Sequence, residues 1–274
     1  MSNGQESQFV LPKPGRVLKA VMLALFAIWL AFALGMNWGG VPPETFYLFA
    51  GSTRLILEGE VWRIFTAPLL HVPSVGGIAF VLIGLYFLTP TLEEQWGGPR
   101  LLRFLAVSSL FAYTFQALLE LALGASLSAK LVGEYWMSFV PAIEAIAIAW
   151  ALTFKGQTVR LFFVLPVTSR GLILFVVGMS VLYVITLERP MCGLLSPFGG
   201  MIAGYLFGGG TPSPARRFWL SLRLARLERE AQRDREARKR RVQGSSLRVI
   251  PGARDEASKD DDDDKRGPDG KLLN

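Results

Sequence analysis

Leu195-Ser-Pro-Phe-Gly-Gly-Met-Ile-Ala-Gly-Tyr-Leu-Phe-Gly208 is the segment that most constrains how this chain folds. Within this apolar run, Gly200, Gly204 and Gly208 recur at every fourth position, so one face of the predicted helix is bare backbone. Helices inside lipid gain nothing from the hydrophobic effect when they associate, and close packing at small residues decides which helices pair. The run therefore predicts a helix that lies tightly against a second helix in a membrane bundle.

The composition of the whole chain is that of a membrane protein. Hydrophobic residues make up 51% of the 274 residues, and charged residues make up only 19%. A run of about 18 apolar residues or more is a candidate for crossing the hydrocarbon core. Six candidate runs lie at about residues 17–37, 74–92, 101–123, 137–154, 171–187 and 193–210. We therefore expect an all-α fold with six transmembrane helices.

Changes in composition along the chain predict four segments. Residues 1–16 are an N-terminal cytoplasmic segment and residues 17–210 are the membrane domain. Residues 211–243 are a linker followed by a basic amphipathic helix, which either stays in solvent or lies on anionic lipid. Residues 244–274 contain an acidic run and much Gly, Pro and Ser, so we expect a charged, disordered tail.

Lys and Arg residues at the ends of the spans predict that both termini are cytoplasmic. These residues precede the first span and follow the second, fourth and sixth: Arg16, Lys19, Arg100, Arg103, Lys155, Arg160, Arg170 and the Arg-rich segment after Pro214. We therefore expect an integral, multi-pass protein of the bacterial inner membrane. Because this topology already explains the net charge of +7, we expect no nucleic-acid partner.

Two carboxyl groups fall inside predicted spans, where ionisable side chains are costly and often functional. Glu120 lies near the outer end of its span, and we expect it to be protonated, paired with a hydroxyl or amide such as that of Gln116, or close to the interface, without a functional role. Glu144 lies deeper, and a structural role and a functional polar site both stay open for it. The chain has one His and one Cys, so we expect no metal site and no cofactor.

Several motifs, taken in order, resemble the rhomboid superfamily. Glu60-Val-Trp62-Arg63, followed by His71, is similar to the Trp-Arg motif and histidine that close the first loop of these proteins. Leu92-Glu93-Glu94 resembles the acidic end of their second helix, and Phe198 to Gly204 resembles their sixth helix. An apolar segment broken by Pro166, expected to run along the inner membrane surface, resembles the segment before their fifth helix. The resemblance covers about residues 15–210 and implies a six-helix rhomboid-like bundle with an interfacial cap.

The resemblance also implies where catalytic groups would stand. A rhomboid protease uses a Ser in a Gly-x-Ser-Gly turn that opens helix four, and a His of helix six just before a Gly-Gly pair as its base. In this chain the serine position is Val140 and the base position is Pro197. A serine hydroxyl needs a base within hydrogen-bond reach to become a nucleophile, and neither of these residues serves that chemistry.

The leading hypothesis is therefore a rhomboid-like pseudoprotease, similar to the derlins and the inactive rhomboids, which bind transmembrane segments without cutting them. Its expected partners are the lipid bilayer and the transmembrane segments of other proteins. The alternative is an active intramembrane serine protease with relocated groups, drawn from Ser138, Ser196 and His71. A third class is a small transporter that uses Glu144, although the chain shows no internal repeat of the kind many carriers have.

Overall fold

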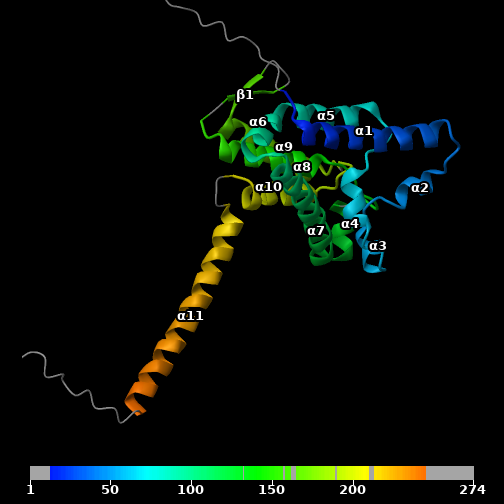
Figure 1. The fold of residues 1–274 in the computed structure, drawn as a ribbon. Coiled ribbons are helices and arrows are strands. Elements are labelled where there is room, and N and C mark those ends of the chain that lie inside the picture. Colours follow the sequence, from blue (N-terminus) through cyan, green and yellow to red (C-terminus); the bar gives the residue numbers. More distant parts are fainter. Residues whose placement is uncertain are drawn as a thin grey trace, which may run out of the picture. The chain divides into compact units, whose positions relative to one another are not determined.

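The computed structural model describes residues 13–131, 133–156, 158–161, 165–188, 190–209 and 213–244. Within these residues the regular structure is helical, apart from one two-stranded hairpin (Figure 1). The chain divides into two compact units, Met1–Trp219 and Leu220–Asn274. The first unit contains all the helices that are candidates for crossing a membrane.

Three helices are long and apolar enough to cross a membrane: α1 (Arg16–Asn37), the Gly98–Leu123 part of α7 (Gly98–Leu131), and α9 (Ser169–Thr186). The pair α5 (Val75–Leu88) and α6 (Pro90–Trp96) makes a fourth candidate, with a bend of 48° between the two helices. Pro90 stands at this bend, where its missing N–H interrupts the helical hydrogen bonds. The chain is thus a multi-pass membrane protein. Six helices coincide with the six predicted runs, but six crossings stay a prediction.

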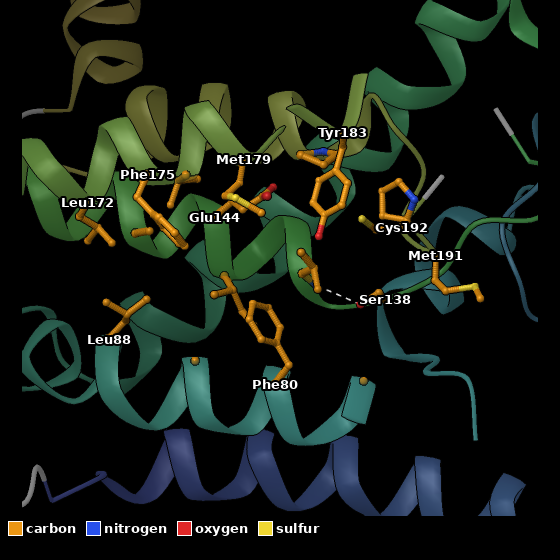
Figure 2. A pocket seen from close by; sticks show the side chains of 18 residues that line it. Phe80, Leu88, Ser138, Glu144, Leu172, Phe175, Met179, Tyr183, Met191 and Cys192 are labelled. Carbon is orange, nitrogen blue, oxygen red and sulfur yellow. Dashed lines mark hydrogen bonds between the residues drawn. The ribbon is translucent and has the colours of Figure 1, made fainter. Parts of the chain in front are cut away.

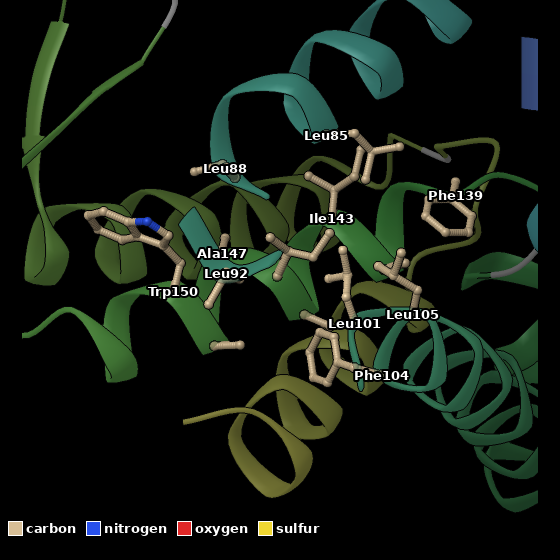
Figure 3. Close-up of a cluster of buried hydrophobic side chains, with 14 of the residues drawn as sticks. Leu85, Leu88, Leu92, Leu101, Phe104, Leu105, Phe139, Ile143, Ala147 and Trp150 are labelled. Carbon is tan, nitrogen blue, oxygen red and sulfur yellow. The ribbon is translucent and has the colours of Figure 1, made fainter. Parts of the chain in front are cut away.

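The remaining two apolar helices are short and form the centre of the first unit. Helix α8 (Val140–Thr153) has 14 residues, of which 10 are buried, so its environment is protein on nearly every side. It contacts α5, α7, α9 and α10 (Ser196–Phe207). Figure 3 shows Ile143, Ala147 and Trp150 among side chains from α5 and α7. Every second residue from Ala145 to Ala151 is Ala, and these small side chains let the neighbouring helices approach α8 closely.

The glycine face of α10 packs against α8. A Cβ atom added at Gly204 would lie 2.5 Å from the carbonyl oxygen of Ala145, and one added at Gly200 or Gly208 would overlap Pro141 or Ala149. The two helices therefore touch backbone to backbone once per turn along their length. Gly199 extends the contact to α7, where an added Cβ would lie 2.8 Å from the Cα of Ala112.

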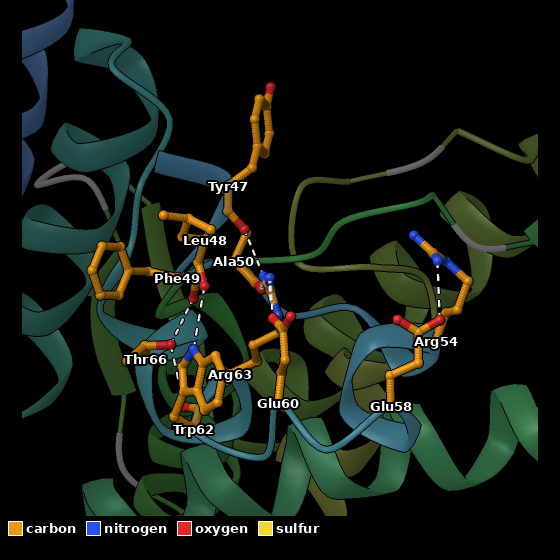
Figure 4. A network of polar contacts seen from close by, with 10 residues as sticks. All are labelled: Tyr47, Leu48, Phe49, Ala50, Arg54, Glu58, Glu60, Trp62, Arg63 and Thr66. Carbon is orange, nitrogen blue, oxygen red and sulfur yellow. Dashed lines mark hydrogen bonds and ion pairs between the residues drawn. The ribbon is translucent and has the colours of Figure 1, made fainter. Parts of the chain in front are cut away.

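The connection between α1 and α5 folds into a cap of short helices, as predicted: α2 (Pro43–Tyr47), α3 (Thr53–Leu57), α4 (Arg63–Thr66) and the 3₁₀ helix η1 (Ala67–Leu69). The buried Arg63 donates to the carbonyl oxygens of Tyr47 at 2.6 Å and Ala50 at 2.7 Å, and it pairs with Glu60 (Figure 4). The guanidinium of Arg63 thus ties the start of α4 to the end of α2 and the residues that follow it. The half-exposed Trp62 donates to the carbonyl of Leu48 at 3.4 Å.

Glu93 ties α6 to the start of α1. Its carboxylate accepts hydrogen bonds from the backbone N–H groups of Gly15 at 2.9 Å, Val17 at 3.1 Å and Leu18 at 3.4 Å. The first N–H groups of a helix have no partner within the helix, and α1 has no side-chain cap of its own. A carboxylate from a distant part of the chain supplies that cap, which is also favourable for the helix dipole.

A hairpin precedes α9. Strand β1 (Thr158–Leu161) pairs antiparallel with β2 (Leu165–Thr168), with Thr158 opposite Thr168 and Arg160 opposite Pro166. The sequence predicts an apolar surface segment broken by Pro166 here, and the hairpin was not predicted. A two-stranded hairpin consists of edge strands, which tolerate a proline because half of their N–H groups need no strand partner.

The second unit is described by itself. Helix α11 (Pro214–Gly244) is the charged helix predicted for this region, and it begins in the first unit. Its Leu220, Leu224 and Leu227 side chains are exposed. The predicted disordered tail at 244–274 lies outside the described residues, apart from Gly244, which ends α11.

Candidate functional site

A cavity of about 410 Å³ lies between α5, α8 and α9. Phe80 and Leu88 of α5 approach it from one side, and Phe175 and Met179 of α9 approach it from the other (Figure 2). Its walls are mainly apolar, and the polar side chains that reach it stand on α8, on α9 and in the loops before α8 and α10. The cavity is therefore a site for an apolar ligand with few polar contacts.

Val140 and Pro197 both line this cavity. Val140 is the first residue of α8 and Pro197 is the second residue of α10. The contact of Gly200 with Pro141 holds these two helix starts together. The structure thus brings together the two positions at which the resemblance puts a serine and its base. The side chains at these positions are a valine and a proline, which neither give nor take a proton.

Ser138 stands in the loop before α8 with a φ of 146°, a region that L-residues rarely occupy. Three hydrogen bonds hold it there. Its N–H donates to the carbonyl of Ala67 at 3.2 Å, its carbonyl accepts from the hydroxyl of Tyr113 at 2.6 Å, and its Oγ accepts from the N–H of Val140 at 3.2 Å. The hydroxyl of Ser138 is therefore an acceptor for the start of α8.

His71 is buried at the end of the cap, and its Nε2 accepts a hydrogen bond from the N–H of Phe139 at 3.2 Å. Burial lowers the pKa of His71 from its ordinary 6.5 to about 4, because the charged imidazolium is disfavoured away from water. The imidazole is consequently neutral at pH 7. The lone pair that a general base would use is bound to the backbone.

These contacts use the backbone donors at the start of α8. Phe139 donates to His71 and Val140 donates to Ser138, while Pro141 has no N–H. The next two N–H groups, of Ala142 and Ile143, donate to the carbonyl of Phe139 at 3.0 and 3.2 Å. The N–H groups of residues 139–143 therefore leave no free donor for an oxyanion beside Val140.

Ser196 and Cys192 lie on the other side of the cavity, at the start of α10. The hydroxyl of Ser196 is fully buried and donates to the carbonyl of Cys192. Burial raises the pKa of the Cys192 thiol to about 12, so the thiol stays protonated at neutral pH. Neither side chain is placed as an activated nucleophile.

Glu144 lies on the cavity wall one turn along α8 from Val140. Its Oε1 accepts from the hydroxyl of Ser180 on α9 at 3.4 Å. Its Oε2 is buried and has no hydrogen-bond partner among the described residues. Glu144 is the one acidic side chain among the described residues that line the cavity.

Glu120 lies outside the cavity and has a structural partner. Gln116 donates from its Nε2 to Glu120 at 2.6 Å and accepts from the N–H of Leu195 at 2.9 Å through its Oε1. Gln116 and Tyr113 thus fix the loops before α10 and α8 to α7. This role of Gln116 and Tyr113 was not predicted from the sequence. Their spacing of three positions in an apolar span does place both on one face of the helix.

The other motif residues stand away from the cavity. Trp62 and Arg63 belong to the cap and Glu93 to the start of α1, while Gly204 and Gly208 lie between α8 and α10. Among the described residues, no group of three His, Cys, Asp or Glu side chains lies close enough to hold a metal ion.

Comparison with known protein families gives a match to this chain. The rhomboid domain family matches residues 58–212, which is more than half of the chain and contains the whole cavity wall. No curated protein matches the chain.

Proposed function

The chain belongs to the rhomboid family of membrane proteins, and we propose that it is a member without protease activity that binds transmembrane segments of other proteins. The observation that carries this proposal is that Val140 and Pro197 line one cavity. Binding a helix and cutting a helix would use the same cavity. Only cutting needs the groups that these two residues replace.

Peptide hydrolysis by a serine enzyme needs a nucleophile, a base and donors for the oxyanion, all within hydrogen-bond reach of one carbonyl group. Val140 supplies no nucleophile and Pro197 supplies no base. Pro141 removes the N–H that follows the nucleophile position, and the neighbouring N–H groups are bound to His71 and Ser138. Three separate requirements are missing at the same place, which favours a loss of catalysis over a shift of one group.

The relocated protease predicted as the alternative would depend on Ser138 and His71. The Oγ of Ser138 and the Nε2 of His71 each accept a backbone N–H at the start of α8. Using the Nε2 lone pair of His71 as the base would leave the N–H of Phe139 without a partner, at a cost of about 1–3 kcal/mol. This cost argues against the alternative.

The proposal includes six membrane crossings with both termini in the cytoplasm. At a rise of about 1.5 Å per residue, α8 and α10 are roughly 21 and 18 Å long, which is shorter than a hydrocarbon core of about 30 Å. Short helices can still cross where their ends continue as loops that are buried in protein. The heavily buried α8, whose first turn is bound to the cap, fits this condition.

Helix α9 is the proposed movable wall of the cavity. Only Ser169, Leu172 and Ser180 of its 18 residues are buried, so little packing holds it against the rest of the unit. A helix about 10 Å wide occupies roughly 420 Å³ per turn, so the cavity of about 410 Å³ accommodates one turn. A longer client segment would enter by displacing α9 from α5.

A photocrosslinking experiment tests binding. The purified protein, with a photoreactive amino acid at Phe175, is reconstituted in liposomes together with a single-pass peptide built from Leu and Ala. We expect capture of the peptide from Phe175, and competition by an excess of unlabelled peptide. A matched control carries the photoreactive group at Leu23 on α1, which is 67% exposed and lies outside the cavity.

Capture from Leu23 should be several-fold weaker and should not respond to competitor, because that position meets only lipid and randomly diffusing peptide. Equal capture from Phe175 and Leu23, with no competition at either, would contradict client binding in the cavity.

A further inference from the structure

Glu144 is the feature of the cavity that client binding alone does not explain. It places a carboxyl group in the first third of α8, where the surrounding cavity wall is formed by Ile143, Ala147, Val176 and other apolar side chains. A transmembrane segment of Leu and Ala would fill such a cavity without any carboxyl group. Binding of an apolar segment therefore does not explain why the cavity contains the carboxyl group of Glu144.

The described contacts of Glu144 leave part of its hydrogen-bonding capacity unused. The hydroxyl of Ser180 lies 3.4 Å from Oε1, near the long end of a hydrogen bond, and its single hydrogen has a nearer acceptor in the carbonyl of Val176 at 3.0 Å. The Oε2 atom is buried without a partner. An unpaired polar atom in apolar surroundings is costly, and a ligand that supplies a donor would remove this cost.

Glu120 provides the contrast within the same protein. It is also a carboxyl group inside a predicted span, and the amide of Gln116 pairs with it at 2.6 Å. It does not line the cavity. The chain thus partners the carboxyl group that faces its own helices and leaves incomplete the one that faces the space for a ligand.

We propose that Glu144 selects client transmembrane segments that carry a neutral hydrogen-bond donor, such as Asn or Gln, at the depth of the cavity. This inference rests on the proposed function and names the chemistry of its clients. A neutral amide enters the hydrocarbon region at a lower cost than Lys or Arg, so it is the donor that suits a site with a single carboxyl group and apolar walls.

The position of Glu144 sets the depth of the donor. Four residues separate it from Val140, which corresponds to about 6 Å along the axis of α8. A matching client therefore carries its amide roughly one helical turn deeper in the membrane than Val140, the first residue of α8.

The test compares two single-pass Leu-Ala peptides in liposomes that contain the full-length protein with the photoreactive group at Phe175. One peptide has Asn at its centre and the other has Leu at that position. We expect the unsubstituted cavity to capture the Asn peptide roughly three- to tenfold better, which is the range expected for an interhelical hydrogen bond in a membrane.

Three variants identify the responsible group. Glu144→Leu should abolish the preference while still capturing both peptides, because the apolar cavity remains. Glu144→Gln keeps a carbonyl acceptor and should retain the preference. Glu120→Gln, the matched control outside the cavity, should also retain it.

The two levels of the proposal fail in different ways. Equal capture of both peptides by the unsubstituted protein, or an unchanged preference in Glu144→Leu, would overturn the role of Glu144 and leave client binding standing. Absence of specific capture for either peptide would overturn the proposed function and this inference together.

Discussion

At the scale of single residues, the polar groups around the cavity act mainly as supports for the backbone. Ser138, His71 and Tyr113 each bind a backbone group in the loop that leads into α8. These contacts hold Ser138 at a φ of 146°, a conformation that costs on the order of 1–3 kcal/mol without support. The residues that the alternative hypothesis needed for chemistry are thus the residues that fix the start of α8.

His71 makes this support dependent on pH. Its folded-state pKa of about 4 lies below the ordinary value of 6.5, so the unfolded chain binds the proton more readily between these values. The contribution of His71 to the free energy of unfolding is fully present above pH 6.5 and falls as the pH drops toward 4. Below pH 4 it no longer changes, and the total loss from this group is about 3 kcal/mol.

Thermal unfolding in detergent across pH 7.5 to 4 measures this effect. We expect His71→Gln, whose side-chain carbonyl can still accept the N–H of Phe139, to lose less stability over this range than the unsubstituted protein. Parallel curves for the two proteins would show that His71 does not titrate with folding.

Motif positions around the cavity can be predicted from the sequence, whereas contacts between distant residues cannot. The assignment of the serine and base positions to Val140 and Pro197 is a prediction from motif spacing and the family resemblance. The hydrogen bond between His71 and Phe139 is not, because it joins residues 68 positions apart whose meeting depends on the fold of the cap. The unpartnered Oε2 of Glu144 cannot be predicted from the sequence either, because it depends on how α9 places Ser180 beside α8.

At the scale of elements, the six apolar runs coincide with α1, α5, α7, α8, α9 and α10, although α7 continues to Leu131, beyond the end of its run. The run 17–37 becomes α1 (Arg16–Asn37), and the run 171–187 becomes α9 (Ser169–Thr186). The break at Pro90 and the hairpin of β1 and β2 do not follow from apolar periodicity, since they depend on backbone pairing and on the bend between α5 and α6. The four-residue spacing of glycines predicts tight packing, but it does not identify α8 as the partner.

The packing of α10 on α8 gives a direct prediction for Gly204. Replacing it with Ala adds a Cβ atom 2.5 Å from the carbonyl oxygen of Ala145, so the two helices must separate. We expect a loss of about 1–3 kcal/mol, the usual cost of overpacking, seen as a lower melting temperature in detergent.

Gly178 on α9 is the matched control, because an added Cβ meets nothing within 4 Å there. Gly178→Ala should leave the melting temperature unchanged or raise it slightly, since Ala is the better helix former. Equal effects of the two substitutions would contradict the close packing of α10 on α8.

At the scale of the whole molecule, the membrane unit and the charged C-terminal unit differ in what holds them together. The first contains the buried clusters around α8, whereas α11 from Leu220 onward exposes its leucines along with its charges. The predicted boundaries at 210 and 243 stay a prediction.

Removal of Leu220–Asn274 tests this division. We expect the truncated protein to keep its melting temperature and its capture of the Leu-Ala peptide, because the cavity is built entirely from residues before 198. A truncated protein that unfolds, or loses capture, would place part of the binding unit in the C-terminal segment.

If the protein binds a transmembrane segment without cutting it, a bound peptide keeps its full mass. The protein is incubated in liposomes with a single-pass peptide that it captures from Phe175, and the peptide is then analysed by mass spectrometry. We predict that the captured peptide retains its full mass after prolonged incubation. Cleavage within the transmembrane segment that disappears in Ser138→Ala or His71→Gln would contradict the account and identify an active protease.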